Sequence, residues 1–136
     1  MSNPVVQIPA APSEEALAHY SALLRFETDC WDVNAALASG GEGFVVLDVR
    51  SEVAYREGHV AGAVSLFHGK ITGSKLRAFG PDRIFVVYCA GPHCNGADKA
   101  ARRIAEPGFP VKQIIGGVTG WLDAGLRLVA GAPPRA

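Results

Sequence analysis

The chain has 136 residues, 49% of them hydrophobic, which is enough for one domain with a hydrophobic core. Its 13 Lys and Arg residues balance 13 Asp and Glu residues, so no overall field attracts a polyanion, and we expect neither a nucleic acid nor a membrane as partner. We expect no signal peptide, because the N-terminus lacks a basic start, and no membrane span, because no long apolar run is present. Three cysteines are too few for a disulfide scaffold. We therefore predict a cytoplasmic protein.

The N-terminal part is predicted to be helical after a disordered start. Residues 1–12 contain three prolines and no periodicity, so we expect disorder there. From Ser13, a predicted N-cap, apolar residues recur at helical spacing: Ala16, Leu17, Tyr20, Leu23 and Leu24. A second helix is predicted from about Thr28 to Ala38, with Cys30 on its apolar stripe and therefore in the core. Residues 13–42 thus form a predicted N-terminal helical extension.

Residues 43–128 have the pattern of an α/β domain. Four short apolar runs are nearly continuous, as in strands that are buried on both faces: Phe44–Leu47, Ala63–Leu66, Ile84–Tyr88 and Val111–Ile115. The segments between them predict helices near 52–57, 69–79, 96–105 and 118–124. We therefore predict a parallel sheet of four to five strands with helices on both faces. Residues 129–136, with two prolines, are expected to be a flexible tail.

Cys89 is the strongest candidate for chemistry. It follows the predicted strand Ile84–Tyr88 and precedes the predicted helix that starts at about Gly96. A helix N-terminus stabilises an anion, so this position is expected to lower the pKa of the thiol. Gly91 and Gly96 would let the loop turn several N–H groups toward the sulfur. The residues alone leave a buried structural cysteine as an equal alternative.

Cys94 lies in the same loop, and its role is open. With four residues between them, Cys89 and Cys94 could approach closely enough to bond, so that Cys94 would resolve a persulfide or form a redox switch. Alternatively, Cys94 points into the core.

Three motifs in order resemble the rhodanese-like domain family. Leu47-Asp-Val-Arg-Ser51 with Tyr55-Arg-Glu-Gly-His-Val-Ala-Gly-Ala63 resembles its first signature. Tyr88-Cys89 resembles the active-site cysteine, and Gly116-Gly-Val-Thr-Gly-Trp121 resembles the closing signature. The resemblance covers about residues 43–128. It implies a sulfurtransferase that moves a sulfane sulfur from a donor such as thiosulfate, through a persulfide on catalytic Cys89, to a thiophilic acceptor.

The predicted substrate-binding loop consists of Ala90, Gly91, Pro92, His93, Cys94, Asn95 and Gly96. It holds no Arg or Lys, and His93 is its only side chain able to carry a positive charge, so the donor is either a small molecule or a protein persulfide. Related phosphatases have an arginine six positions after the cysteine; Asn95 stands there and disfavours that activity. A non-enzymatic module that senses oxidants through Cys89 and Cys94 is the alternative function.

Asp48 and Arg50 end the first predicted strand on the side of Cys89, where they are predicted to pair and support its loop. His59 is expected to be structural, as are Phe109 and Trp121. Scattered histidines and one Cys-x4-Cys pair do not make a metal site, and we predict no metal or cofactor. For the segment around Trp31, a packing helix is favoured over a cap on the site or a homodimer surface.

Overall fold

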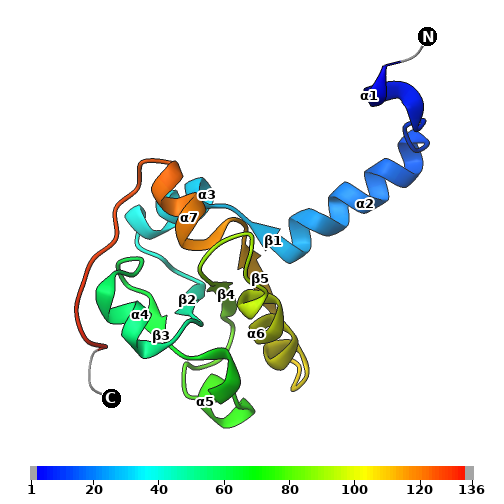
Figure 1. Ribbon diagram of the computed structural model, residues 1–136. Coiled ribbons are helices and arrows are strands. Elements are labelled where there is room, and N and C mark those ends of the chain that lie inside the picture. The colour runs from blue at the N-terminus through cyan, green and yellow to red at the C-terminus, as the bar shows by residue number, and fades with distance from the viewer. Residues whose placement is uncertain (1–2, 134–136) are drawn as a thin grey trace.

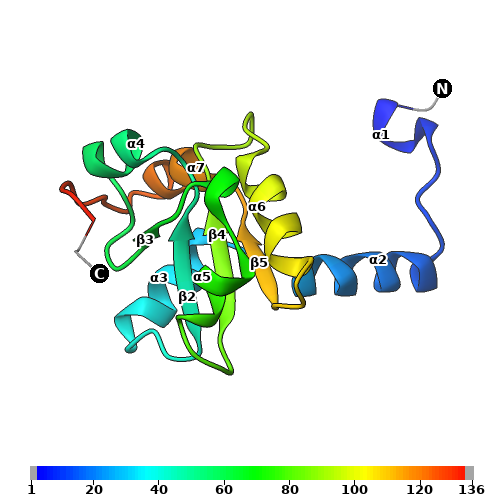
Figure 2. The same ribbon diagram turned by 90° about the horizontal axis from the view of Figure 1, so that it is seen from below.

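A five-stranded parallel sheet forms the centre of the protein. The computed structural model describes residues 3–133. The strands lie in the order β1-β5-β4-β2-β3, and every pairing is parallel. The predicted α/β class and parallel sheet are confirmed (Figure 2). The strands are β1 (Glu27–Thr28), β2 (Phe44–Asp48), β3 (Val64–Ser65), β4 (Ile84–Tyr88) and β5 (Val111–Ile114).

Helices cover both faces of the sheet, so the strands carry apolar residues on both sides. The helical elements are α1 (Pro4–Gln7), α2 (Ser13–Phe26), α3 (Cys30–Ala38), α4 (Glu52–Glu57), the 3₁₀ turn η1 (His68–Lys70), α5 (Gly73–Arg77), α6 (Gly96–Ala105) and α7 (Gly117–Asp123). On one face, Val45 and Leu47 of β2 pack in a cluster with residues of α5 and α6; on the other, Val46 packs with residues of α3, α4 and α7. Alternate residues of a strand point to opposite faces, which explains the continuous apolar runs.

The N-terminal extension differs from its prediction. Helix α2 forms, but it projects away from the domain (Figure 1), and none of its residues is buried. Leu17 and Leu24 of its apolar stripe are 70% and 73% exposed. Ser13 is the first helical residue rather than the N-cap, a position taken by Pro12 without a side-chain hydrogen bond. The periodicity predicted the helix correctly, and its apolar stripe is exposed to solvent.

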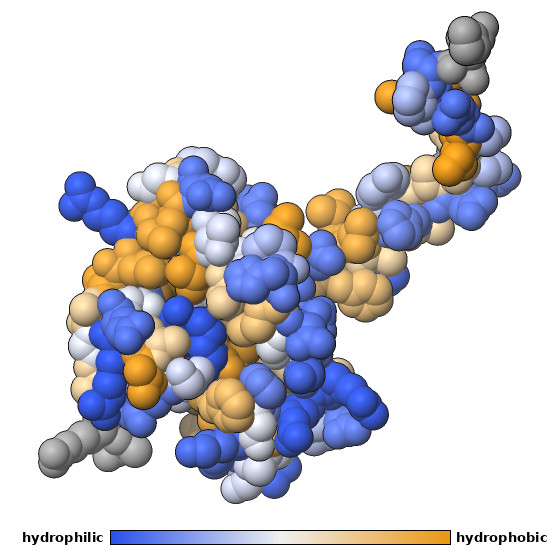
Figure 3. All heavy atoms as spheres, in the orientation of Figure 1, coloured by the Kyte–Doolittle hydropathy of each residue, from blue (hydrophilic) through white to orange (hydrophobic). Residues whose placement is uncertain are grey.

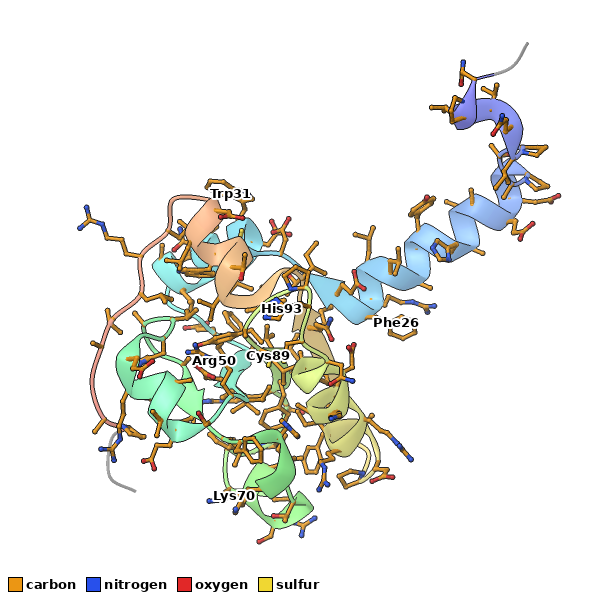
Figure 4. All side chains as sticks on the ribbon, in the orientation of Figure 1. Phe26, Trp31, Arg50, Lys70, Cys89 and His93 are labelled. Atoms are coloured by element: carbon orange, nitrogen blue, oxygen red, sulfur yellow. The ribbon has the colours of Figure 1, made fainter. Side chains whose placement is uncertain are left out.

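Helix α3 packs on the domain through Cys30 and Val33, which confirms Cys30 as a core residue. The predicted packing helix is therefore present, although Trp31 itself points outward and is 59% exposed (Figure 4). Apolar side chains of α2 likewise form part of the visible surface (Figure 3). Within residues 3–133, no helix combines the length and the apolar character needed to cross a membrane.

The two ends of the chain contain more structure than was predicted. Helix α1 lies within the predicted disordered start and is capped by the Asn3 side chain. In the predicted tail, Val129 exchanges two backbone hydrogen bonds with His59. The predictions for residues 1–2 and 134–136 lie outside the described residues.

Candidate functional site

The candidate site lies at the carboxyl end of β4, in the loop that leads into α6. Cys89 directly follows β4 and is 6% exposed. Its carbonyl accepts a hydrogen bond from the Val118 N–H, and the Ala90 carbonyl accepts bonds from the N–H and hydroxyl of Thr119. These bonds fix the start of the loop to α7. The backbone of Cys89 and Ala90, where the loop begins, is therefore fixed in place by α7.

Two thiols meet inside this loop, and we call Cys89 and Cys94 the thiol pair. Their Sγ atoms lie 2.8 Å apart, and both cysteines are free. Cys94 is half-buried, whereas Cys89 is buried. The Gly96 N–H donates to Cys94 Sγ over 3.5 Å. Cys94 thus interacts directly with the sulfur of Cys89 and also packs against the core cluster that contains Cys89.

Gly96 is the residue that lets the helix start so close to the sulfur. A Cβ at this position would lie 2.6 Å from Cys89 Sγ, far inside van der Waals contact. The same Cβ would approach Cys94 Sγ to 3.5 Å. The first residue of α6 must therefore lack a side chain for the thiol pair to take this arrangement.

The pKa prediction for Cys89 is wrong. Burial first, and then the hydrogen bond with Cys94, raise the pKa of Cys89 to about 11, and the amides of Ala90 and Gly96 oppose this only in part. The pKa of Cys94 is lowered, first by the hydrogen bond from Cys89 and then by the Gly96 amide. Desolvation thus outweighs the helix N-terminus at the buried thiol. The first thiolate of the pair is therefore favoured on Cys94.

The predicted ring of loop N–H donors is smaller than expected. The amides of Ala90 and Gly96 act on the sulfurs, but the Cys94 N–H donates to the Gly91 carbonyl at 3.1 Å and closes a turn. Pro92 has no N–H to offer. The side chains of Pro92, His93 and Asn95 are exposed around this turn (His93 is labelled in Figure 4). Substrate binding by residues 90–96 stays a prediction.

Asp48, Arg50 and Tyr88 form a polar network beside the loop, which we call the carboxylate cluster. Arg50 Nη2 lies 2.7 Å from Asp48 Oδ2, and Arg50 Nε donates to Asp48 Oδ1 at 3.0 Å. The Tyr88 hydroxyl donates to Asp48 Oδ2 at 2.7 Å and accepts from the Val60 N–H. Asp48 is completely buried. The predicted pairing of Asp48 with Arg50 is present and is not a solvated surface contact.

The same cluster ties two further segments to the end of β4. Arg50 Nη2 also donates to the Gly58 carbonyl at 2.6 Å. Burial, and next the charge of Asp48, raise the pKa of Tyr88 far above its ordinary value, so its hydroxyl keeps the proton that it donates. The cluster thus joins β2, β4 and the turn after α4.

His59 and Trp121 have structural surroundings, as predicted. The His59 ring is buried, stacks on Tyr55 with the ring centres 3.6 Å apart, and has Nδ1 2.7 Å from the Tyr55 carbonyl oxygen. Trp121 is buried and donates its indole N–H to the Arg127 carbonyl. Phe109 is half-buried against Phe85. Within residues 3–133, none of these three side chains forms a hydrogen bond with the thiol pair.

Sequence reasoning missed the part that α7 plays in holding the loop. Gly117 has a φ of +55°, and a Cβ there would overlap the Cys89 carbonyl oxygen and lie 2.8 Å from the Gly91 nitrogen. Thr119 bonds the Ala90 carbonyl from the same helix. The adjacent glycines Gly116 and Gly117 were the available signal, because two glycines between a strand and a helix indicate a close backbone approach.

Comparison with known proteins places this geometry in a family. The model of the rhodanese-like domain matches residues 32–124. The HTH-type transcriptional regulator Rv0324 of Mycobacterium tuberculosis is 34% identical over 88 residues, which are 65% of this chain. The chain corresponds to only 38% of the length of that regulator.

Solved structures share the fold over most of the chain. The BH2092 protein of Bacillus halodurans is 37% identical, with a TM-score of 0.83 over 88% of this chain and 87% of its own. The thiosulfate sulfurtransferase of Pseudomonas aeruginosa has a TM-score of 0.70 at 24% identity, over 89% of this chain and 22% of its own. At that identity, the second likeness shows the fold alone.

Proposed function

This chain belongs to the rhodanese-like domain family, and from that premise we propose that it is a sulfurtransferase that carries a sulfane sulfur as a persulfide on Cys89. The observation that carries the proposal is the position of Cys89, buried at the end of β4 with a second thiol 2.8 Å from its sulfur. The match to the rhodanese-like domain family supports the same chemistry.

The proposed reaction begins with a proton transfer within the thiol pair. Because its pKa is lowered, Cys94 is the thiol that loses its proton first, and its thiolate, 2.8 Å away, is the base that accepts the Cys89 proton. This transfer is uphill, since the pKa of Cys89 is about 11, and the attack on the donor drives it. The Cys89 thiolate then attacks the outer sulfur of the donor, the bond from that sulfur to the rest of the donor breaks, and sulfite leaves when the donor is thiosulfate. The persulfide that remains on Cys89 is an anion, which the Ala90 and Gly96 amides stabilise. A thiophilic acceptor takes its terminal sulfur and restores the Cys89 thiolate.

Thiocyanate formation from thiosulfate and cyanide tests this proposal. Cys89→Ser should abolish the activity, because serine cannot hold a sulfane sulfur. Cys94→Ser should retain measurable activity, since Cys94 only receives a proton. Cys30→Ser is the matched control, because Cys30 is buried in the other core cluster, and it should match the wild type. Persistence of activity in Cys89→Ser would sink the proposal; inactivity of the wild type toward every sulfane donor, including glutathione persulfide, would do the same.

The short distance between the thiols favours a second candidate, a redox-sensing module. In this scheme the Cys94 thiolate attacks one oxygen of hydrogen peroxide, the O–O bond breaks, hydroxide leaves, and Cys94 becomes a sulfenic acid. The Cys89 thiol then attacks the Cys94 sulfur, water leaves, and a disulfide forms. The similarity to a transcriptional regulator is compatible with such a role.

Mass spectrometry distinguishes the two candidates in the Cys30→Ser background. A sensor should lose two hydrogens upon peroxide treatment and recover them with a dithiol. Neither change should occur in Cys94→Ser, which cannot form the bond. A protein that instead accumulates irreversible sulfinic acid on either cysteine is not a reversible sensor.

A further inference from the structure

A basic groove lies between α6 and η1, beside the candidate site. It has a volume of about 570 Å³. In Figure 3, hydrophilic side chains gather over α6, where one wall of the groove stands. We call it the α6 groove, and it is lined by His68, Gly69, Lys99, Arg102, Arg103 and Glu106.

The charge of the groove is predominantly positive and is not neutralised within the chain. Three cationic side chains, Lys99, Arg102 and Arg103, face one carboxylate, Glu106. All three cations are exposed, and within residues 3–133 none of them forms a salt bridge. Burial, and then the charges of Lys99 and Arg103, lower the pKa of His68. The neutral total charge of the chain therefore conceals a local surface that attracts anions.

Helix α6 connects the groove with the thiol pair, because its first residue contacts the sulfurs and its later residues line the groove. Gly96 donates its N–H to Cys94 Sγ, and Lys99 follows three residues later on the same helix. The charge of Lys99 also reaches Cys94, whose thiolate it favours. Because the loop from Ala90 to Gly96 holds neither Lys nor Arg, these cations of α6 are available to orient a partner that exchanges sulfur with the pair.

We infer that the α6 groove binds an acidic segment of the protein that donates sulfur to Cys89 or accepts sulfur from it. This inference rests on the proposed sulfurtransferase function and names its partner class. An acidic protein segment fits better than a nucleic acid, because the neighbouring thiols need a partner that carries sulfur. Electrostatic complementarity of this kind aligns two proteins before they react.

Binding is tested first, without any sulfur chemistry. The probe is a fluorescent glutamate-rich peptide that lacks cysteine, and its anisotropy is followed with the full chain. The double variant R102E/R103E, which leaves Lys99 and its effect on Cys94 unchanged, should bind about tenfold more weakly, whereas R83E/R127E, which removes two exposed cations elsewhere, should bind like the wild type. Wild-type binding should also weaken between about 0.01 M and about 1 M salt, as the Debye length shrinks from about 30 to about 3 Å.

Sulfur transfer is tested second, with a peptide that carries a cysteine persulfide between glutamates. The groove variant should accept sulfur from it about tenfold more slowly, yet react normally with the matching lysine peptide and with glutathione persulfide. Equal rates or equal binding for the groove variant and the wild type would overturn the inference. So would tighter groove-dependent binding of a single-stranded oligonucleotide than of the acidic peptide. If Cys89 accepts no sulfur from any donor while the peptide still binds, the proposed function fails, whereas the binding of acidic segments by the α6 groove is supported.

Discussion

Two polar groups of residues share the carboxyl end of β4, and they are built in opposite ways. In the carboxylate cluster, Asp48 is completely buried and its oxygens are bonded by Arg50 and Tyr88. In the thiol pair, Cys94 is only partly covered, and the two sulfurs interact chiefly with each other. A buried charge that loses its partners strongly destabilises the folded protein. A thiol, by contrast, is a small hydrophobic group that tolerates burial. The first group should therefore determine stability, and the second should determine reactivity.

The largest loss of stability is expected for Asp48→Ala. This change leaves the Arg50 guanidinium without its carboxylate and the Tyr88 hydroxyl without its acceptor, so the free energy of unfolding should fall by about 3–5 kcal/mol. Urea unfolding followed by the fluorescence of buried Trp121 measures it. Asp48→Asn should lose less, because it keeps an acceptor for Tyr88. The control is Asp123→Ala, an exposed residue at the end of α7; a similar loss for both alanine variants would contradict the structural role of the cluster.

Gly96→Ala should have an intermediate effect on stability and a strong effect on sulfur chemistry. The new methyl group would meet Cys89 Sγ at 2.6 Å, so the loop must shift, at a cost of about 1–3 kcal/mol. Thiocyanate formation should fall sharply, because the thiol pair is displaced. Gly120→Ala in α7 is the matched control: its methyl group would find ordinary contact at 3.5 Å, and alanine favours a helix. Unchanged activity in Gly96→Ala would show that the tight packing at the sulfur is unimportant.

The sequence predicts those elements whose burial is two-sided or whose ends carry clear signals. Strand β4 and helix α6 have the predicted limits, since an apolar run ends at a cysteine and a glycine begins the helix. The two-residue strand β1 is too short for any periodicity. The predicted helix over 69–79 became η1 and α5, because Thr72 interrupts it as an N-cap.

For the site, the sequence located Cys89 and the pairing of Asp48 with Arg50, but not the balance of forces on the thiol. A helix N-terminus can be read from a glycine-containing loop, whereas the depth of burial that opposes it depends on packing from both sheet faces. The distance between Cys89 and Cys94 likewise depends on the turn closed by the bond from the Cys94 N–H to the Gly91 carbonyl. The apolar periodicity of α2 predicts that the helix has an apolar stripe, but it does not predict what that stripe contacts.

The smallest change in stability, about 1 kcal/mol, is expected for Cys94→Ser. This variant should nevertheless change the pH dependence of Cys89. Cys94 raises the pKa of Cys89 through its hydrogen bond and its charge, in addition to the larger effect of burial. Removing the Cys94 thiolate should therefore lower the pKa of Cys89, so that its alkylation by iodoacetamide begins at a lower pH than in the wild type. The rate at Cys89 is followed by peptide mass spectrometry, in the Cys30→Ser background.

In the wild-type pair, Cys94 should be alkylated first, because its pKa is the lowered one. If Cys89 is instead alkylated first in the wild type, or if its pH profile is the same with and without Cys94, then the two thiols titrate independently, and the contrast between a cluster for stability and a pair for reactivity loses its second half.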